Sequence, residues 1–298
     1  MRTVKADLHY HGPIGFEPYW LDVQGYKGKN LLKLIADACF KRDLTICAIT
    51  SESDQTDEKG VILKGSIHDR IGYLIENYLN NLNQTHGYEA DRFGLNSIVV
   101  EKNGKRLYLM SGITPIVINK GKRLDYLIFG SNSVPNFMNL KDTQKYCNDN
   151  GLCHGLEHPD LEAHFGIGLD EAAYYIETAD FLEGHNAQLL WPRLMKKIPK
   201  IGNYTKIHND KAKKFAKKHN KPAIATSDGH MIESAGAASI EFREDFIDTE
   251  DEQNFLETIR SVILSNDFKA NEGYDSFINW INWVTKFQRG ISGYRYKK

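Results

Sequence analysis

The sequence predicts an α/β barrel. Short apolar runs rich in Val, Ile, Leu and Phe alternate with amphipathic segments along most of the 298 residues. This alternation is typical of repeated β-α units around a parallel sheet. Seven such runs favour a closed barrel, although the alternation is also compatible with an open sheet. The predicted strands cover residues 3–8, 44–50, 107–113, 124–129, 151–156, 179–182 and 222–225.

Helices and one hairpin are predicted between these strands. Amphipathic periodicity marks residues 30–41, 170–178 and 209–219 as helical. In the last of these helices, lysines surround one apolar side, which consists of Ile207, Ala212, Phe215 and Ala216. Asn103-Gly104 lies between polar and β-branched residues, and this pair predicts a type I′ hairpin.

Residues 55–94 depart from the alternation. They are polar and mostly helical in propensity, and they follow the second predicted strand on the face where barrels place their active-site loops. We interpret them as a helical insertion that acts as a lid or gates the substrate, with ordinary surface helices as the alternative. No linker or repeat divides the chain, so a single domain over residues 1–298 is expected.

The C-terminal residues 274–298 predict a helix followed by a basic tail. The helix carries an apolar stripe made of Phe277, Trp280, Ile281, Trp283, Val284 and Phe287. Such a stripe favours packing on the outer face of the barrel or against a partner subunit in a homo-oligomer. Binding to a membrane surface normally requires more positive charge on the helix itself.

Composition narrows the range of partners. The formal net charge is -1, so the chain has no broad basic field to attract a nucleic acid or an anionic membrane. No apolar stretch approaches the length of a membrane span, and the first residues do not resemble a signal peptide. The four cysteines, Cys39, Cys47, Cys147 and Cys153, lack metal-knuckle spacing. We therefore expect a cytoplasmic protein with reduced thiols.

Residues with metal-binding chemistry follow three of the predicted strands. In the first strand, Asp7, His9 and His11 alternate with apolar residues, so both imidazoles are expected on one face at the carboxyl end. The seventh strand leads into Asp228 and His230, which repeats this spacing of two residues.

The fifth strand ends at His158, which is followed by Pro159. The carboxyl ends of barrel strands converge on one rim, where residues are typically catalytic. The three placements together therefore favour a metal site over structural histidines.

In this order, the motifs resemble those of the polymerase and histidinol phosphatase (PHP) family of metal-dependent phosphoesterases. The matching pieces are Asp7-Leu8-His9-Tyr10-His11 for D-L-H-x-H, His158-Pro159 for H-P, residues 181–186 for an E-x-x-N-like strand, and Ser227-Asp228-Gly229-His230 for S-D-x-H. The resemblance spans about residues 3–241. It implies a distorted barrel of about seven β-α units with up to three divalent ions at its mouth. It also implies metal-ligand roles for His9, His11, His158, Asp228 and His230.

Two motifs depart from the family pattern. The chain reads Thr50-Ser51-Glu52 where the family has T-D-H, and Glu52 remains able to bind a cation. It reads Gly112-Ile113-Thr114 where the family has a bridging glutamate, and a histidine expected one strand later is replaced by Asp125 or Tyr126. Without the bridge, two close ions would repel each other with little compensation.

We therefore expect one or two ions of Mn, Zn, Mg or Fe. One ion is assigned to His9, His11 and Asp228, and a second to Glu52 and His230, while an ion at His158 should be weak or absent. Other donors near these motifs are Glu17, Asp54, His154 and Glu157, for which solvated or capping roles are favoured.

The expected activity is hydrolysis of a small phosphate monoester or diester by metal-activated water, with His9, His11, Asp228 and His230 at the catalytic centre. Lys59, Lys64 and Arg70 are available as phosphate partners. Two alternatives remain open. Amidohydrolase barrels also begin with H-x-H, and the substituted motifs are compatible with a degenerate protein that binds a metal or another ligand without catalysis.

Overall fold

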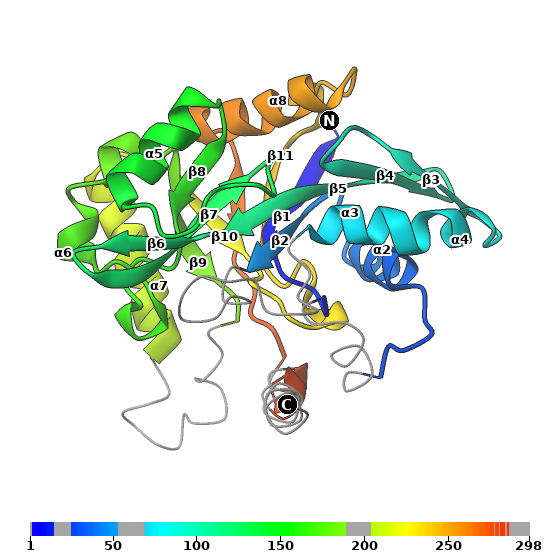
Figure 1. Cartoon of the computed structure of the whole chain (residues 1–298), viewed down its shortest axis with the longest axis horizontal. Coiled ribbons are helices and arrows are strands. Elements are labelled where there is room, and N and C mark those ends of the chain that lie inside the picture. The colour runs from blue at the N-terminus through cyan, green and yellow to red at the C-terminus, as the bar shows by residue number, and fades with distance from the viewer. Residues whose placement is uncertain are drawn as a thin grey trace.

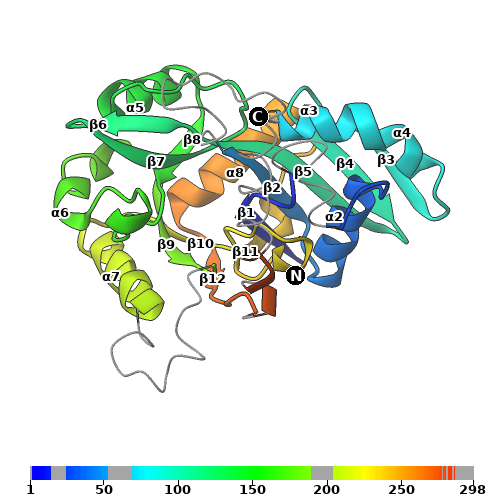
Figure 2. The same ribbon diagram turned by 60° about the horizontal axis from the view of Figure 1, so that its bottom comes forward.

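In the computed structural model of the chain, the sheet curves into a nearly closed barrel with helices on its outside (Figures 1 and 2). The structure describes residues 2–14, 25–52, 69–188, 204–276, 278, 279, 281–283 and 285. The expected α/β barrel class is confirmed. Within the described residues the sheet has 12 strands.

Nine of these strands follow one another around the barrel in the order β10-β9-β8-β7-β5-β2-β1-β11-β12. Their bounds are β1 Thr3–Tyr10, β2 Ile46–Glu52, β5 Lys105–Thr114, β7 Lys122–Phe129, β8 Cys153–Leu156, β9 Phe181–Asn186, β10 Ala223–Thr226, β11 Ser239–Arg243 and β12 Lys269–Asn271. The remaining strands are β3 Tyr88–Arg92 and β4 Ser97–Lys102, which extend the sheet from β5, and β6 Ile116–Asn119, which pairs with β7.

The sheet is mixed, so the expectation of uniformly parallel β-α units is wrong. Strands β1, β2 and β5 are mutually parallel, as are β8, β9 and β10. Strand β7 runs antiparallel to both β5 and β8. It is reached from β6 through the turn Lys120-Gly121, in which both residues have positive φ. Antiparallel neighbours need only such a short connection, whereas parallel neighbours need a crossover.

The predicted type I′ hairpin is confirmed. Asn103 and Gly104 join β4 to β5 with φ values of 51° and 74°. Positive φ at both central residues defines this turn and explains why an Asn-Gly pair occupies it.

Helices cover two flanks of the barrel. The first flank carries α2 (Leu31–Lys41), α3 (Arg70–Leu74) and α4 (Asn80–Asn83), with the π-helical segment η2 (Ile75–Leu79) between α3 and α4. The opposite flank carries α5 (Leu140–Asp149), α6 (Leu169–Ala172) and α7 (Tyr204–Lys218) (Figures 1 and 2). Helix α8 (Glu252–Ser265) packs against the residues that fill the barrel interior.

The predicted helices agree with this arrangement in part. The helix expected at 30–41 is confirmed, and the Asn30 side chain caps it by accepting a hydrogen bond from the Lys33 amide at 2.9 Å. The segment 170–178 is interrupted, because α6 ends at Ala172 and a 3-10 turn, Ile176–Thr178, follows. In α7, Ile207 is 47% exposed, so its assignment to the buried side is wrong.

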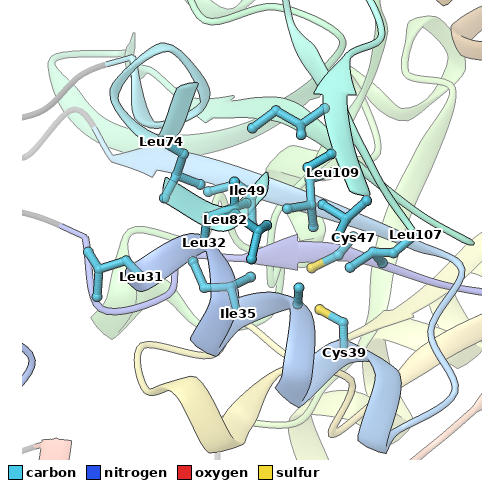
Figure 3. Close-up of a cluster of buried hydrophobic side chains, with 14 of the residues drawn as sticks. Leu31, Leu32, Ile35, Cys39, Cys47, Ile49, Leu74, Leu82, Leu107 and Leu109 are labelled. Atoms are coloured by element: carbon cyan, nitrogen blue, oxygen red, sulfur yellow. The ribbon is translucent and has the colours of Figure 1, made fainter. Parts of the chain in front are cut away.

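The barrel interior is apolar and closely filled. A single hydrophobic cluster takes side chains from β1, β2, β5, β7, β8, β9, β10, β11 and α8. A second cluster lies outside β1, β2 and β5 and includes residues of α2, α3 and α4 (Figure 3). All four cysteines are buried and none forms a disulfide, as expected for reduced thiols.

Part of the predicted insertion belongs to this second cluster. Leu74 and Leu82 are fully buried and lie near Ile49 and Leu109 of the sheet (Figure 3). The described part of the insertion, 69–94, is thus a packed portion of the fold that ends in β3. The lid interpretation is therefore confined to 55–68, which lies outside the described residues.

The closing contacts of the barrel join the carboxyl ends of β1 and β10. The Asp228 amide donates to the His9 carbonyl at 2.7 Å, and the amides of His11 and Gly12 donate to the Gly229 carbonyl at 2.9 Å. These bonds bring the two predicted ligand pairs, which are more than 200 positions apart in the chain, to one point of the rim. No helix in the described part of the chain has the length and apolar character of a membrane span.

The packing of the insertion generates the first prediction. Replacing Leu74 with alanine should lower the free energy of unfolding by about 2–5 kcal/mol, because it leaves a cavity in a filled cluster. Leu95 is 81% exposed, and the matched change Leu95→Ala should alter stability by less than about 0.5 kcal/mol. Denaturant unfolding of both variants measures this difference. Equal stabilities would mean that the segment 69–94 is dispensable to the fold.

Candidate metal centre

The candidate site lies at the carboxyl ends of five strands, β1, β2, β8, β9 and β10. The antiparallel strand β7 contributes one residue near its middle, Asp125. The six residues predicted as metal ligands all lie on this rim, namely His9, His11, Glu52, His158, Asp228 and His230. Three groups of three residues could each bind a metal ion, because within each group one donor atom per residue lies within 4.8 Å of the other two. The first group is His9-His11-Asp228, the second is Asp125-Glu157-His158 and the third is His11-Glu52-His230.

A β-bulge in β1 sets the direction of the two N-terminal histidines. Three steps along β1 from Asp7 to Tyr10 match two steps along β2 from Cys47 to Ile49, so β1 contains one extra residue. As a result the Asp7 carboxylate does not join the two imidazoles, and it accepts hydrogen bonds from the backbone amides of Ser227, Gly236 and, at 3.4 Å, His9. The expectation that Asp7, His9 and His11 share one face is thus wrong for Asp7.

Asp7 has a structural role. It is fully buried, and burial raises the pKa of its carboxyl group to about 6 even though the Ser227 and Gly236 amides favour the charged form. Its hydrogen bonds tie β1 to the loop that follows β10.

In the first group, three donor atoms face one point. His9 Nε2 and His11 Nε2 are 2.9 Å apart, and Asp228 Oδ1 lies 3.2 Å from His11 Nε2 and 3.6 Å from His9 Nε2. Ligands bonded at about 2.1 Å to a tetrahedral ion are separated by about 3.4 Å. The spacing of these buried atoms therefore fits a shared divalent cation.

The remaining polar atoms of these ligands are held by neighbouring groups. His9 Nδ1 lies 2.9 Å from Glu183 Oε1, and His11 Nδ1 lies 3.0 Å from the Thr50 carbonyl oxygen. A carbonyl oxygen only accepts, so His11 Nδ1 carries the proton and Nε2 keeps its lone pair. Glu183 acts on His9 in the same way, because a carboxylate that accepts from one ring nitrogen leaves the other free to bind a metal.

Glu183 is the centre of this supporting network. Its side chain is buried, and it also accepts from the His158 amide at 2.9 Å, from Asn186 Nδ2 at 3.1 Å and from the Thr226 hydroxyl. Burial by itself would raise the pKa of Glu183, but His9 and His158 keep it below the usual value. Asn186 Nδ2 also donates to Asp228 Oδ2 at 2.9 Å, which leaves Oδ1 facing the histidines.

The second group is centred on Glu157. Its Oε1 atom lies 3.3 Å from His158 Nε2 and 3.5 Å from His9 Nε2, so one carboxylate oxygen lies between the first and second groups. Glu157 is 4% exposed, and the solvated role expected for it is wrong. Glu157 Oε2 and His158 Nδ1 are buried and lack hydrogen-bond partners among the described residues. Buried polar atoms without a protein partner are usually satisfied by water or a bound ion.

The charges of the second group also suit a bound cation. Burial, together with the nearby Glu157 carboxylate, raises the pKa of Asp125 to about 7. Burial opposes the charged form of His158, but Glu157 and Glu183 outweigh it and raise the pKa of the imidazole to about 9. Carboxylates crowded in a dry site are costly unless they are protonated or paired with cations.

The third group has a different environment. Glu52 Oε1 lies 3.5 Å from His230 Nδ1 and 3.6 Å from His11 Nδ1. The Arg70 guanidinium lies beside it, with Nη2 at 3.3 Å from Glu52 Oε2. Burial alone would raise the pKa of Glu52, but His11, His230 and Arg70 lower it to about 2. Burial lowers the pKa of His230 to about 4.

Two of the predicted ligands have unusual backbone conformations. The φ angles of His158 and Asp228 are 24° and 47°, in the left-handed region that L residues rarely adopt. Such strain persists where surrounding contacts impose it, and it clusters at functional sites. Here the imposing contacts are the Glu183 carboxylate on the His158 amide and the His9 carbonyl on the Asp228 amide.

Several other predicted residues lie away from the centre or outside the description. His154 contacts Tyr126 and Asn148, while Glu17, Asp54, Lys59 and Lys64 lie outside the described residues. Arg70 is described but is only 1% exposed. The expectation that Arg70 is available as a partner of a substrate phosphate is therefore wrong.

The C-terminal segment approaches the same rim. The Trp283 ring stacks on His230 with centroids 5.0 Å apart and an angle of 26° between planes. The stripe residues Phe277, Trp280, Val284 and Phe287 lie outside the described side chains. Trp283, at least, packs at the mouth of the site and not on the outer face of the barrel.

Comparisons with known proteins agree with this fold. Residues 206–261 match the model of the PHP-associated family. PsfC from Pseudomonas syringae PB-5123 aligns over 98% of this chain and 99% of its own, with 11% identity and a TM-score of 0.53. No curated protein shows significant sequence similarity to the chain.

Two longer proteins align with most of this chain. One is a two-domain protein from Bacteroides vulgatus ATCC 8482 that contains a predicted PHP-like metal-dependent phosphoesterase. It aligns over 91% of this chain and 65% of its own, with 14% identity and a TM-score of 0.52. The other is a lesion-specific endonuclease from Pyrococcus furiosus, with coverages of 90% and 58%, 14% identity and a TM-score of 0.47. This chain thus spans less than two thirds of either protein. The chain thus shares its fold with a protein that contains a predicted PHP-like phosphoesterase, and its residues 206–261 are similar to the PHP-associated family.

Proposed function

We propose that the chain is a metal-dependent phosphoesterase that hydrolyses a small phosphate monoester or diester. The observation that carries this proposal is the convergence of His9, His11 and Asp228 on one point, with Glu157 beside them. Nitrogen and carboxylate donors of this kind suit Mn, Fe and Zn, and a larger carboxylate share favours harder ions.

We assign two ions to the centre. The first would be held by His9, His11 and Asp228, and the second by Asp125, Glu157 and His158. Glu157 Oε1 is near both groups, so this carboxylate can compensate two cations at once. It would supply the bridge that Thr114 cannot supply, because the Thr114 side chain is a neutral hydroxyl that donates to the Ser51 carbonyl. On this assignment the second ion binds at His158, where the sequence predicts only a weak ion, and not at Glu52 and His230.

When bound, divalent ions lower the pKa of water and compensate the charge of phosphoryl oxygens. The residues of the chain orient the metal ligands and keep the site largely buried. Glu183 and the Thr50 carbonyl hold His9 and His11 with Nε2 toward the site, and Asn186 turns Asp228 Oδ1 in the same direction. Fixed donors reduce the reorganisation needed during the reaction.

A direct attack by water suits the available side chains. The cysteines are buried, and burial raises the pKa of Cys47, Cys153 and Cys147, the last to about 12, so these thiols remain protonated. The Ser227 hydroxyl donates a hydrogen bond to the His9 carbonyl and so links the ends of two strands. This bond makes Ser227 a poor candidate for a nucleophile.

Phosphate release tests the proposed reaction directly. The chain, stripped of metal and reloaded with Mn²⁺, should release phosphate from a monoester, or an alcohol and a monoester from a diester, in a panel of both, and chelation should abolish the hydrolysis. Amide hydrolysis without phosphate release would favour an amidohydrolase. Bound metal with neither activity would favour the non-catalytic alternative.

Removal of a ligand of the first group should lower metal content. His9→Ala or Asp228→Ala should each lose about one ion per chain and most of the activity, because a deleted donor weakens metal affinity by more than the 10–100-fold typical of outer-sphere changes. Elemental analysis and circular dichroism would follow metal content and folding. His86 is exposed in a turn and provides the matched control His86→Ala. Full metal content in both ligand variants would contradict the assignment.

The bridging role of Glu157 predicts a different pattern. Glu157→Gln should lose the second ion but retain the first, so the metal content should fall by about half. Glu162 is exposed and close in sequence, so Glu162→Gln serves as the control. Titration calorimetry with Mn²⁺ distinguishes the two ions by affinity. An unchanged titration of the Glu157 variant would remove this residue from the centre.

A further inference from the structure

The cluster of His11, Glu52 and His230 already contains a cationic side chain. Arg70 begins α3 and extends inward, where Nη1 donates to the His11 and Thr50 carbonyls at 2.6 Å each. Its Nη2 atom lies 3.3 Å from Glu52 Oε2. Arg70 is among the largest fully buried side chains of the described residues.

The ring geometry of this cluster opposes a shared metal ion. The His11 and His230 rings are stacked, with centroids 4.5 Å apart and only 12° between their planes. A histidine lone pair lies in the plane of its ring, and two nearly parallel planes do not meet at a common point close to both rings. Trp283 extends the stack on the other face of His230.

His11 has no free donor for this cluster. Its Nδ1 atom faces Glu52 at 3.6 Å, but that nitrogen donates its proton to the Thr50 carbonyl. Its other nitrogen, Nε2, faces His9 and Asp228. Although one atom from each of the three residues lies within 4.8 Å of the others, the atom that His11 offers is therefore blocked.

We propose that the Arg70 guanidinium takes the position of a third cation, so that this chain binds divalent ions only at the other two groups. This inference rests on the proposed metal-dependent function. A guanidinium stays protonated at any working pH. Unlike a bound ion, it supplies its charge at every metal concentration. Glu52 then acts as the partner of Arg70, and His230 forms the wall between His11 and Trp283.

This arrangement separates two roles that a third ion would combine. Arg70 provides a fixed positive charge at the mouth, but at 1% exposure it does not reach the substrate. It is therefore a positioning residue, which holds the strand ends through the His11 and Thr50 carbonyls. Because Thr50 O also accepts from His11 Nδ1, the guanidinium contacts the same carbonyl that orients a ligand of the first group.

Counting ions tests the proposal without relying on activity. In excess Mn²⁺ the unmodified chain should bind about two ions. Arg70→Met should bind about three, since removal of the guanidinium leaves the Glu52 carboxylate uncompensated and free to bind an ion with His230 alone, without a donor from His11. Arg260 pairs with the buried carboxylate of Asp180 through two hydrogen bonds. Arg260→Met is thus the matched control and should keep two ions.

Glu52→Gln decides the question even if Arg70→Met fails to fold. Glu52 is partly exposed, and if it is the partner of Arg70 and not a metal ligand, this variant should keep the ion count of the unmodified chain. A lower count in Glu52→Gln, or an unchanged count in folded Arg70→Met, would overturn the proposal. Three ions in the unmodified chain would overturn the role of Arg70 alone. An unmodified chain that binds none would overturn the metal centre itself.

Discussion

The hydrogen bonds that join the ends of β1 and β10 are the contacts on which the candidate centre depends. They run between the backbones of His9 and Asp228 and between those of His11 and Gly229, so the bonds that close the barrel also place the two ligand pairs side by side. The bulge in β1 then turns His9 toward the interior. Fold and site are consequently coupled, because neither pair of residues can face the other in an open sheet.

Charge balance is the second constraint on this rim. Asp125, Glu157, Glu183 and Asp228 lie in or near one dry space. Among the described arginines, Arg123 reaches Asp125, and Arg70 reaches Glu52 at the edge of this space. Uncompensated buried carboxylates are costly, and the raised pKa of Asp125 is one sign of that cost. The proposed pair of divalent ions would relieve this imbalance, and Arg70 would compensate the remaining carboxylate.

The sequence alone predicted the barrel class and the convergence of the histidines, because H-x-H and D-x-H follow strand ends and parallel strand ends meet at one rim. It did not predict the antiparallel β7, the bulge at His9, the burial of Arg70 or the position of Glu157 between two groups. These features arise from pairing and packing between distant segments, which local periodicity does not encode. Glu157 had a weak local signal, since it directly precedes His158 at a strand end.

Anomalous scattering from crystals of the unmodified chain grown with Mn²⁺ tests the central claim most directly. The account predicts one peak between His9 Nε2, His11 Nε2 and Asp228 Oδ1, and a second among Asp125, Glu157 and His158. The space between Glu52 and His230 should hold the guanidinium and no ion. A peak at Glu52 with Arg70 displaced, or the absence of any peak beside His9, would contradict it.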